Sequence, residues 1–219
     1  MADRKLFSQS NCIMPISVGQ DIHEGKKFAA VIKLVNASFK ECTILVDDSV
    51  QHHTMQIDNP ASKEILYHQA LEEGDRWLER NEAIFRELTI PYKILRWDDW
   101  LARADFSDSY DRVLNLYHKN ADYQAQLHSN IDEFLARYLR MRGTQVEYDR
   151  AFNLCLGYLL EECAVMCLWP KNGYHFEVYP SGRNKAMHAT YEYLIKPEYG
   201  DYLKSVALRF KKYPALMEV

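Results

Sequence analysis

The chain has 219 residues and a mass of 25.8 kDa, which suits a single α/β domain with one buried core. Hydrophobic residues make up 47% and charged residues 26% of the sequence, and no apolar run approaches the roughly 18 residues that cross a bilayer. The net charge of −4 does not favour a polyanionic partner on global electrostatics alone. We therefore expect one domain over residues 1–219 that does not span a membrane.

The N-terminus and the cysteines favour a reducing cytoplasm. Basic residues occur near the start, but no apolar stretch of signal-peptide length precedes the polar residues 8–11. The five cysteines are an odd number without a metal-type pairing pattern, and most lie in apolar stretches where a thiol packs as a small hydrophobe. We expect a cytoplasmic protein with reduced cysteines, no metal site and no cofactor.

Strand and helix patterns alternate through the first 97 residues. Apolar, β-branched runs at 12–16, 42–47 and 91–97 are typical of strands, and apolar residues at helical spacing fill 25–39 and 61–88. This βαβαβ order predicts a single Rossmann-like domain, with a mostly parallel sheet of about five strands and helices on both faces. Ligands of such sheets bind beyond the carboxyl ends of the strands, and Ser17 lies at such an end.

The rest of the chain is mostly helical in rhythm. Two or three helices are expected between 97 and 142, and a long helix from 146 to 168. A turn at 170–173 then precedes a strand at 174–179, and a last helical region follows residue 181. No repeat or linker supports a second domain.

Several common functional motifs are absent from the sequence. It has no GxGxxG, GxxxxGK[ST], HExxH, paired CxxC or GxSxG pattern, which weakens nucleotide, zinc and standard serine-hydrolase interpretations. The histidines at 23, 52, 53 and 175 have no acidic or cysteine partner at ligand spacing. We assign these histidines no catalytic role.

Ser17 is a candidate acyl acceptor because of its place in the predicted sheet. It follows an apolar strand and precedes Gly19, in a turn where backbone N–H groups and the next helix terminus can stabilise an oxyanion. A serine at a strand end also commonly serves only to satisfy backbone groups of a turn. Position alone leaves both interpretations open.

Tyr158 and Glu162 form a second candidate pair. They are four residues apart in a largely apolar helix and therefore project from one face. A phenol and a carboxyl in one pocket can hold a substrate ammonium, and partial burial suits the carboxyl for proton transfer. The alternative is that Glu161 and Glu162 line a solvated face while Tyr158 packs half-buried.

Four segments, taken in order, resemble the landmarks of the tRNA-dependent cyclodipeptide synthases: Ile13-Met-Pro-Ile-Ser-Val-Gly-Gln20, Asp48-Ser-Val-Gln-His-His53, Tyr158-Leu-Leu-Glu-Glu162 and Val178-Tyr-Pro180. The similarity covers roughly residues 12 to 195. That family is similar to the Rossmann catalytic domain of class I tyrosyl- and tryptophanyl-tRNA synthetases without ATP-binding signatures. This agrees with the βαβαβ order and the missing nucleotide motifs.

The resemblance implies catalytic roles for Ser17, Tyr158, Glu162 and Tyr179. An aminoacyl group would pass from one tRNA to Ser17, a second aminoacyl-tRNA would attack that ester, and cyclisation would release a diketopiperazine. Each turnover would consume two aminoacyl-tRNAs and no ATP, because the tRNA ester already stores the activation. Gln20 and Pro180 at the positions that divide the family imply its Tyr-Pro branch.

The resemblance also implies a substrate pocket beneath Ser17. The residues expected to contact substrate are Gly19, Gln20, Pro180, Ile13, Pro15, Val46, Val165 and Glu177. Pro15 departs from the glycine that many members carry two residues before the serine, and the helix at 61–88 is acidic where relatives use a basic helix for tRNA. A non-catalytic aminoacyl-tRNA-binding module and an ordinary serine hydrolase or thioesterase therefore stay open as alternatives. The sequence specifies neither the amino acids joined nor the oligomeric state.

Overall fold

The computed structural model describes residues 4–143 and 146–208, and these form a Rossmann-like α/β domain around an all-parallel sheet. The strand order is β3-β2-β1-β4-β5. The strands are β1 (Asn11–Ser17), β2 (Glu41–Asp47), β3 (Tyr92–Arg96), β4 (Phe176–Val178) and β5 (Lys204–Val206). The predicted fold class is confirmed, although β4 is shorter than expected and β5 follows a stretch that was expected to be helical.

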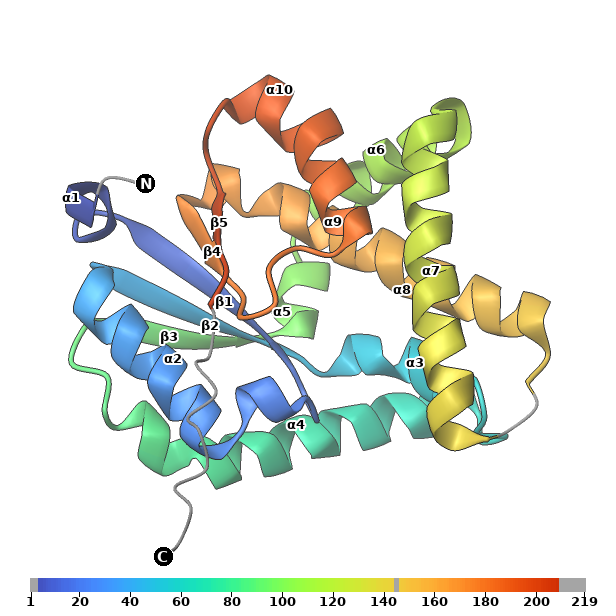
Figure 1. Ribbon diagram of the computed structural model, residues 1–219, viewed down its shortest axis with the longest axis horizontal. Helices are drawn as coiled ribbons and strands as arrows, with labels where there is room; N and C mark the ends of the chain where they lie inside the picture. Colours follow the sequence, from blue (N-terminus) through green and yellow to red (C-terminus); the bar gives the residue numbers. More distant parts are fainter. Residues whose placement is uncertain (1–3, 144–145, 209–219) are drawn as a thin grey trace, which may run out of the picture.

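Helices cover both faces of this sheet (Figure 1). The α-helices are α1 (Arg4–Phe7), α2 (Gly25–Ser38), α3 (His52–Met55), α4 (Lys63–Phe85), α5 (Trp97–Leu101), α6 (Phe106–Lys119), α7 (Ala121–Arg142), α8 (Tyr148–Leu168), α9 (Lys185–Thr190) and α10 (Lys196–Tyr199). Short 3-10 turns occur at η1 (Asp21–His23), η2 (Ser49–Gln51) and η3 (Pro170–Asn172), and a π-helical turn at η4 (Tyr191–Ile195). The predicted helices at 25–39, 61–88 and 146–168 begin and end within about three residues of α2, α4 and α8.

Alternation along the strands divides the core into two clusters. Met14 and Ile16 of β1 point to the face covered by α2 and α4, where they share a cluster with Phe28 and Trp77. Ile13 points the other way, into the cluster built around α8. Because successive side chains in a strand face opposite sides, Ser17 lies on the α8 face together with Ile13.

α8 is the central helix of the second cluster. By length and composition alone this helix, with a mean hydropathy of 1.5, would be long and apolar enough to cross a membrane. Its residues Cys163 to Leu168 are almost entirely buried against α6, α7 and the sheet. That packing is typical of the core helix of a soluble protein, whose burial explains its apolar composition.

The order in which the chain adds strands to the sheet reverses between β1 and β4. From β1 the chain moves outward through β2 to β3, and it later returns to the other side of β1 to form β4 and β5. Such a switch point leaves a crevice for ligands at the carboxyl ends of the two central strands. Ser17 ends β1 and Tyr179 directly follows β4, so both lie at this point.

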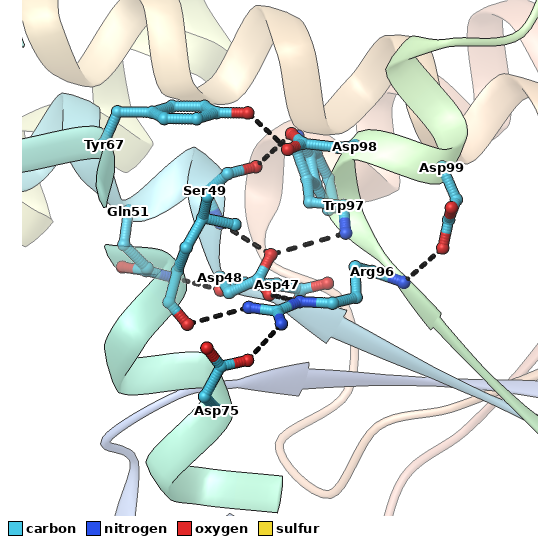
Figure 2. Close-up of polar contacts among 11 residues, drawn as sticks. Asp47, Asp48, Ser49, Gln51, Tyr67, Asp75, Arg96, Trp97, Asp98 and Asp99 are labelled. Atoms are coloured by element: carbon cyan, nitrogen blue, oxygen red, sulfur yellow. Dashed lines mark hydrogen bonds and ion pairs between the residues drawn. The ribbon is translucent and has the colours of Figure 1, made fainter. Parts of the chain in front are cut away.

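A partly buried cluster of Arg96, Asp48 and Asp75 secures α4 against the carboxyl ends of β2 and β3 (Figure 2). The side chain of Arg96, at the end of β3, contacts Asp48 and Asp75 and donates to the Leu71 carbonyl at 2.8 Å. Asp48, fully buried, also accepts from the Ser49 backbone N–H at 2.7 Å. α4 comes so close here that a Cβ at Gly74 would lie 2.7 Å from Asp48 Oδ2. Glycine is therefore required for this packing.

Candidate active site

Ser17 and Tyr179 meet at the switch point of the sheet. The hydroxyl oxygens of Ser17 and Tyr179 are 3.0 Å apart, within hydrogen-bonding distance, and either can be the donor. Pairing of Ile13 with Glu177 brings β1 and β4 together in parallel, so alternate residues of both strands share the α8 face. Burial raises the pKa of Tyr179 to about 12, which keeps its phenol protonated at neutral pH.

α8, which packs over this face of the sheet, brings Tyr158 and Glu162 to the same site. Burial raises the pKa of Glu162 from its ordinary 4.5 to about 7; an Asn184 amide 3.4 Å from Oε2 opposes this rise, and the charge of Glu177 adds to it. Burial, followed by the charge of Glu162, raises the pKa of Tyr158 well above its ordinary value. A carboxyl with a pKa near 7 can both take and return a proton at neutral pH.

The structure separates the two adjacent glutamates of α8. The Glu161 carboxylate accepts from Trp97 Nε1 at 2.6 Å and lies 3.4 Å from His53 Nε2. Glu162 instead lies among the groups around Tyr179. The expected assignment of Glu162 to the Ser17 site agrees with this placement, and the alternative of two solvated glutamates does not.

Two further carboxyl groups lie beneath the hydroxyl pair. Asp47, the register partner of Ser17 at the end of β2, is 3% exposed, and its Oδ1 has no partner among the described residues. Burial, then the charges of Glu162 and Asp48, raises its pKa. Glu177 is fully buried and accepts from Arg183 Nε at 2.6 Å. Three carboxyl groups beside one guanidinium form a site suited to a substrate ammonium.

Asp47 was not predicted as a site residue, although a signal for it was present. It ends the second strand of the predicted parallel sheet, and the carboxyl ends of neighbouring parallel strands lie at one edge. His23 is the second residue that the sequence did not single out: its Nδ1 accepts the backbone N–H of Ser17 at 3.0 Å. Only the folded η1 turn reveals this contact, since histidine spacing carries no sign of it.

Of the residues expected beneath Ser17, most lie on the face of the sheet that α8 covers, and one lies on the face that α2 and α4 cover. Ile13 and Val165 are fully buried in the α8 cluster, and Pro15 is buried on the same side of β1 as Ser17. Val46 packs in the α2–α4 cluster instead. The prediction that Val46 lines this site is wrong, because it is the neighbour of Asp47 in the strand and must face the opposite way.

The turn after β1 and the segment that follows Tyr179 frame the site. Gly19 has φ +82°, a left-handed conformation that favours glycine, and the Gln20 N–H donates to the Ser17 carbonyl at 3.2 Å. Gln20 is exposed. Pro180 is buried, and its carbonyl accepts from the Leu208 N–H at 3.0 Å.

Along α4, acidic neighbours pair with most of the basic side chains. Arg76 contacts Glu72 and Glu73, Arg80 contacts Glu24, and Arg86, directly after α4, contacts Glu82. Surface pairs of this kind add little stability, but they leave less unpaired positive charge for a nucleic acid.

Comparison with solved structures shows the family to which this chain belongs. A scan against protein-family models and a search of curated proteins found no match. A solved cyclodipeptide synthase from Fluoribacter dumoffii is 62% identical, with a TM-score of 0.93, over 96% of this chain and 93% of that chain. The chain belongs to the cyclodipeptide synthases. As a member of this family it is a tRNA-dependent aminoacyltransferase that makes cyclic dipeptides from aminoacyl-tRNA.

More distant structures share the fold. The cyclodipeptide synthase from Candidatus Glomeribacter gigasporarum, solved bound to Phe-tRNAPhe, is 18% identical, with a TM-score of 0.73, over 99% of this chain and 96% of that chain. The tyrosyl-tRNA synthetase from Archaeoglobus fulgidus is 13% identical, with a TM-score of 0.53, over 94% of this chain and 56% of that chain. The expected relation to the class I synthetase catalytic domain is confirmed at the level of the fold.

Proposed function

We propose that this cyclodipeptide synthase works by a ping-pong route through an aminoacyl ester on Ser17. The observation that carries the proposal is the 3.0 Å contact between the Ser17 and Tyr179 hydroxyls, at a switch point where a carboxyl with a pKa near 7 also lies. A hydroxyl is a weak nucleophile by itself, and neighbouring groups that move protons at neutral pH activate it. The substrates are two aminoacyl-tRNAs per turnover, consistent with the tRNA-bound relative.

In the first step, Ser17 Oγ attacks the carbonyl carbon of an aminoacyl-tRNA. The bond from that carbon to the ribose oxygen breaks, a new ester bond to Oγ forms, and the serine proton ends on the ribose oxygen. Tyr179, hydrogen-bonded to Oγ, orients the attacking oxygen and passes the proton on. No ATP is needed, because one ester is exchanged for another.

The carboxyl groups around Ser17 bind the ammonium end of the acyl group. Asp47 offers a carboxyl oxygen without a partner among the described residues, Glu162 offers a carboxyl with a pKa near 7, and Tyr158 contributes a hydroxyl from α8. In the second step the amine of another aminoacyl-tRNA attacks the Ser17 ester. A peptide bond forms, the bond from the acyl carbon to Ser17 Oγ breaks, and Oγ takes back a proton through Tyr179 as the dipeptidyl-tRNA forms. Glu162 takes the proton that this amine must lose, which is the task that a pKa near 7 suits.

In the last step the amine of the dipeptidyl-tRNA attacks its own tRNA ester. The ring closes, the ribose oxygen leaves with a proton, and the diketopiperazine is released. Ile13, Pro15, Val165 and Glu177 shape the subsite that holds the first aminoacyl group. Gln20 and Pro180 place the enzyme in the Tyr-Pro branch.

Intact-protein mass spectrometry tests the covalent step. Wild-type protein mixed with a full set of aminoacyl-tRNAs should gain the mass of an aminoacyl group, and chromatography should detect a diketopiperazine. Ser17→Ala should give neither, whereas Ser107→Ala, an exposed serine of α6, should give both. Product without any adduct at Ser17 would refute the covalent route. Salt-dependent tRNA binding with no product would favour the non-catalytic alternative.

A further inference from the structure

His23 is a buried histidine that contacts both Ser17 and Tyr179. It ends η1 and has no exposed surface. Its Nδ1 lies 3.0 Å from the Ser17 backbone nitrogen and 3.3 Å from the Ser17 carbonyl oxygen. Its ring packs edge-on against Tyr179, with ring centres 5.3 Å apart. From the α4 side, the indole Nε1 of the fully buried Trp77 donates to the His23 carbonyl at 3.0 Å.

The hydrogen bond determines the protonation state of the ring. A backbone N–H can only donate, so Nδ1 of His23 must carry a lone pair toward Ser17. Burial lowers the pKa of His23 to about 4, so the ring is neutral at neutral pH and its proton is on Nε2. Nε2 is buried and has no hydrogen-bond partner among the described residues. The hydrogen bond that the ring accepts therefore comes from the Ser17 backbone N–H.

The same contact closes the turn that carries the nucleophile. The Gln20 N–H donates to the Ser17 carbonyl at 3.2 Å, and the His23 N–H donates to the Gln20 carbonyl at 2.8 Å. Gly19 supplies the left-handed residue that this turn needs. His23 therefore connects the end of the turn back to Ser17, the first residue of the turn. Its ring also packs against the Tyr179 ring, whose hydroxyl contacts Ser17.

We propose that His23 is a positioning residue for acyl transfer, which holds the Ser17 backbone and the Tyr179 ring so that the two hydroxyls meet. This inference rests on the proposed covalent function of Ser17. His23 does not touch the substrate; it acts through the two residues that it contacts. A displacement of a reacting group by about 1 Å can cost about 100-fold in rate, so loss of this contact should appear in the rate constant of acylation.

Three substitutions separate a positioning role from a merely structural one. His23→Asn keeps an acceptor near the place of Nδ1, His23→Gln moves the acceptor toward the place of Nε2, and His23→Leu removes it. Rapid mixing with one charged tRNA, followed by intact-mass measurement of the Ser17 adduct, gives the acylation rate constant and the substrate concentration at half-maximal rate. His68→Asn, on the exposed face of α4, is the matched control.

We expect His23→Leu and His23→Gln to slow acylation about 100-fold with little change in the half-saturating concentration, and His23→Asn to recover most of the rate. His68→Asn should acylate as wild type does. Equal rates for the Asn and Gln variants, or a wild-type rate in a folded Leu variant, would overturn the proposal; the Asn and Gln pair decides even if the Leu variant does not fold. An absence of adduct in wild type would instead refute the Ser17 ester itself.

Discussion

Replacement of Glu162 by glutamine should stabilise the protein, and more so at alkaline pH. In the folded protein burial raises the pKa of this carboxyl from 4.5 to about 7. Both states are protonated well below 4.5, whereas between 4.5 and about 7 the unfolded chain releases the proton that the folded chain retains. Above about 7 the folded chain must also ionise a carboxyl that its surroundings disfavour. Wild type therefore loses stability as the pH rises through this window, and Glu162→Gln does not.

The size of the effect follows from the two pKa values. Linkage gives a cost to wild type of about 1 kcal/mol near pH 5.5 and about 3 kcal/mol near pH 8. The stability advantage of Glu162→Gln should therefore grow by about 2 kcal/mol between these conditions. Glu162→Gln also favours folding through Asp47, because the charge of Glu162 is one of the causes that raise the Asp47 pKa and the substitution removes it.

Urea unfolding of wild type and Glu162→Gln at the two pH values measures this difference directly. Glu161→Gln is the matched control on the same helix: its carboxylate accepts the Trp97 indole N–H at 2.6 Å, so its replacement should not stabilise the protein at either pH. An advantage of Glu162→Gln that is absent, or that shrinks as the pH rises, would refute the picture of a carboxyl held with a raised pKa. The same variant should lose diketopiperazine synthesis.

The raised pKa of Glu162, the close packing at Gly74 and the opposite faces of Val46 and Val165 can each be tested by substitution or by pH. Acyl transfer to the second amine should rise with pH through about 7, because only ionised Glu162 can take the amine proton; pH–rate profiles of wild type and Glu162→Gln check this. Gly74→Ala should destabilise the protein by about 2 kcal/mol in thermal or urea unfolding, because the new Cβ would meet Asp48 and Arg96. This cost outweighs the helix propensity of alanine, which favours it over glycine by about 1 kcal/mol. Increased stability would contradict the close approach of α4. Val165→Ala and Val46→Ala should each lower the free energy of unfolding by about 2 kcal/mol. Only Val165→Ala should change which cyclic dipeptides appear in product profiling, since Val46 faces α2 and α4. An altered profile for Val46→Ala would contradict the placement of these side chains.

Much of the fold could be predicted from local pattern. The apolar runs that became β1 and β2 and the periodic segments that became α2, α4 and α8 carry their period in the chain itself. β5 could not be found this way, because it is three residues long and joins the sheet only by pairing with β4. Propensity says little about so short a strand, since its partner supplies the stabilisation.

The site shows the same division. Ser17, Tyr158, Glu162 and Tyr179 could be named from sequence because a family resemblance pointed to them, and α-helical spacing placed Tyr158 and Glu162 on one face. Val46 was assigned to the wrong face, because an error of one residue along a strand reverses the side to which the side chain points.

The βαβαβ order and the apolar faces follow from the sequence alone, because they depend on residues a few positions apart. Which chemically active side chains come together depends on packing between distant segments. The 3.0 Å contact of Ser17 with Tyr179 joins positions 162 residues apart, and the contact of His23 with Ser17 exists only because the turn after β1 closes on itself. The raised pKa of Glu162 arises from burial, which is a property of the packed core and of no local pattern.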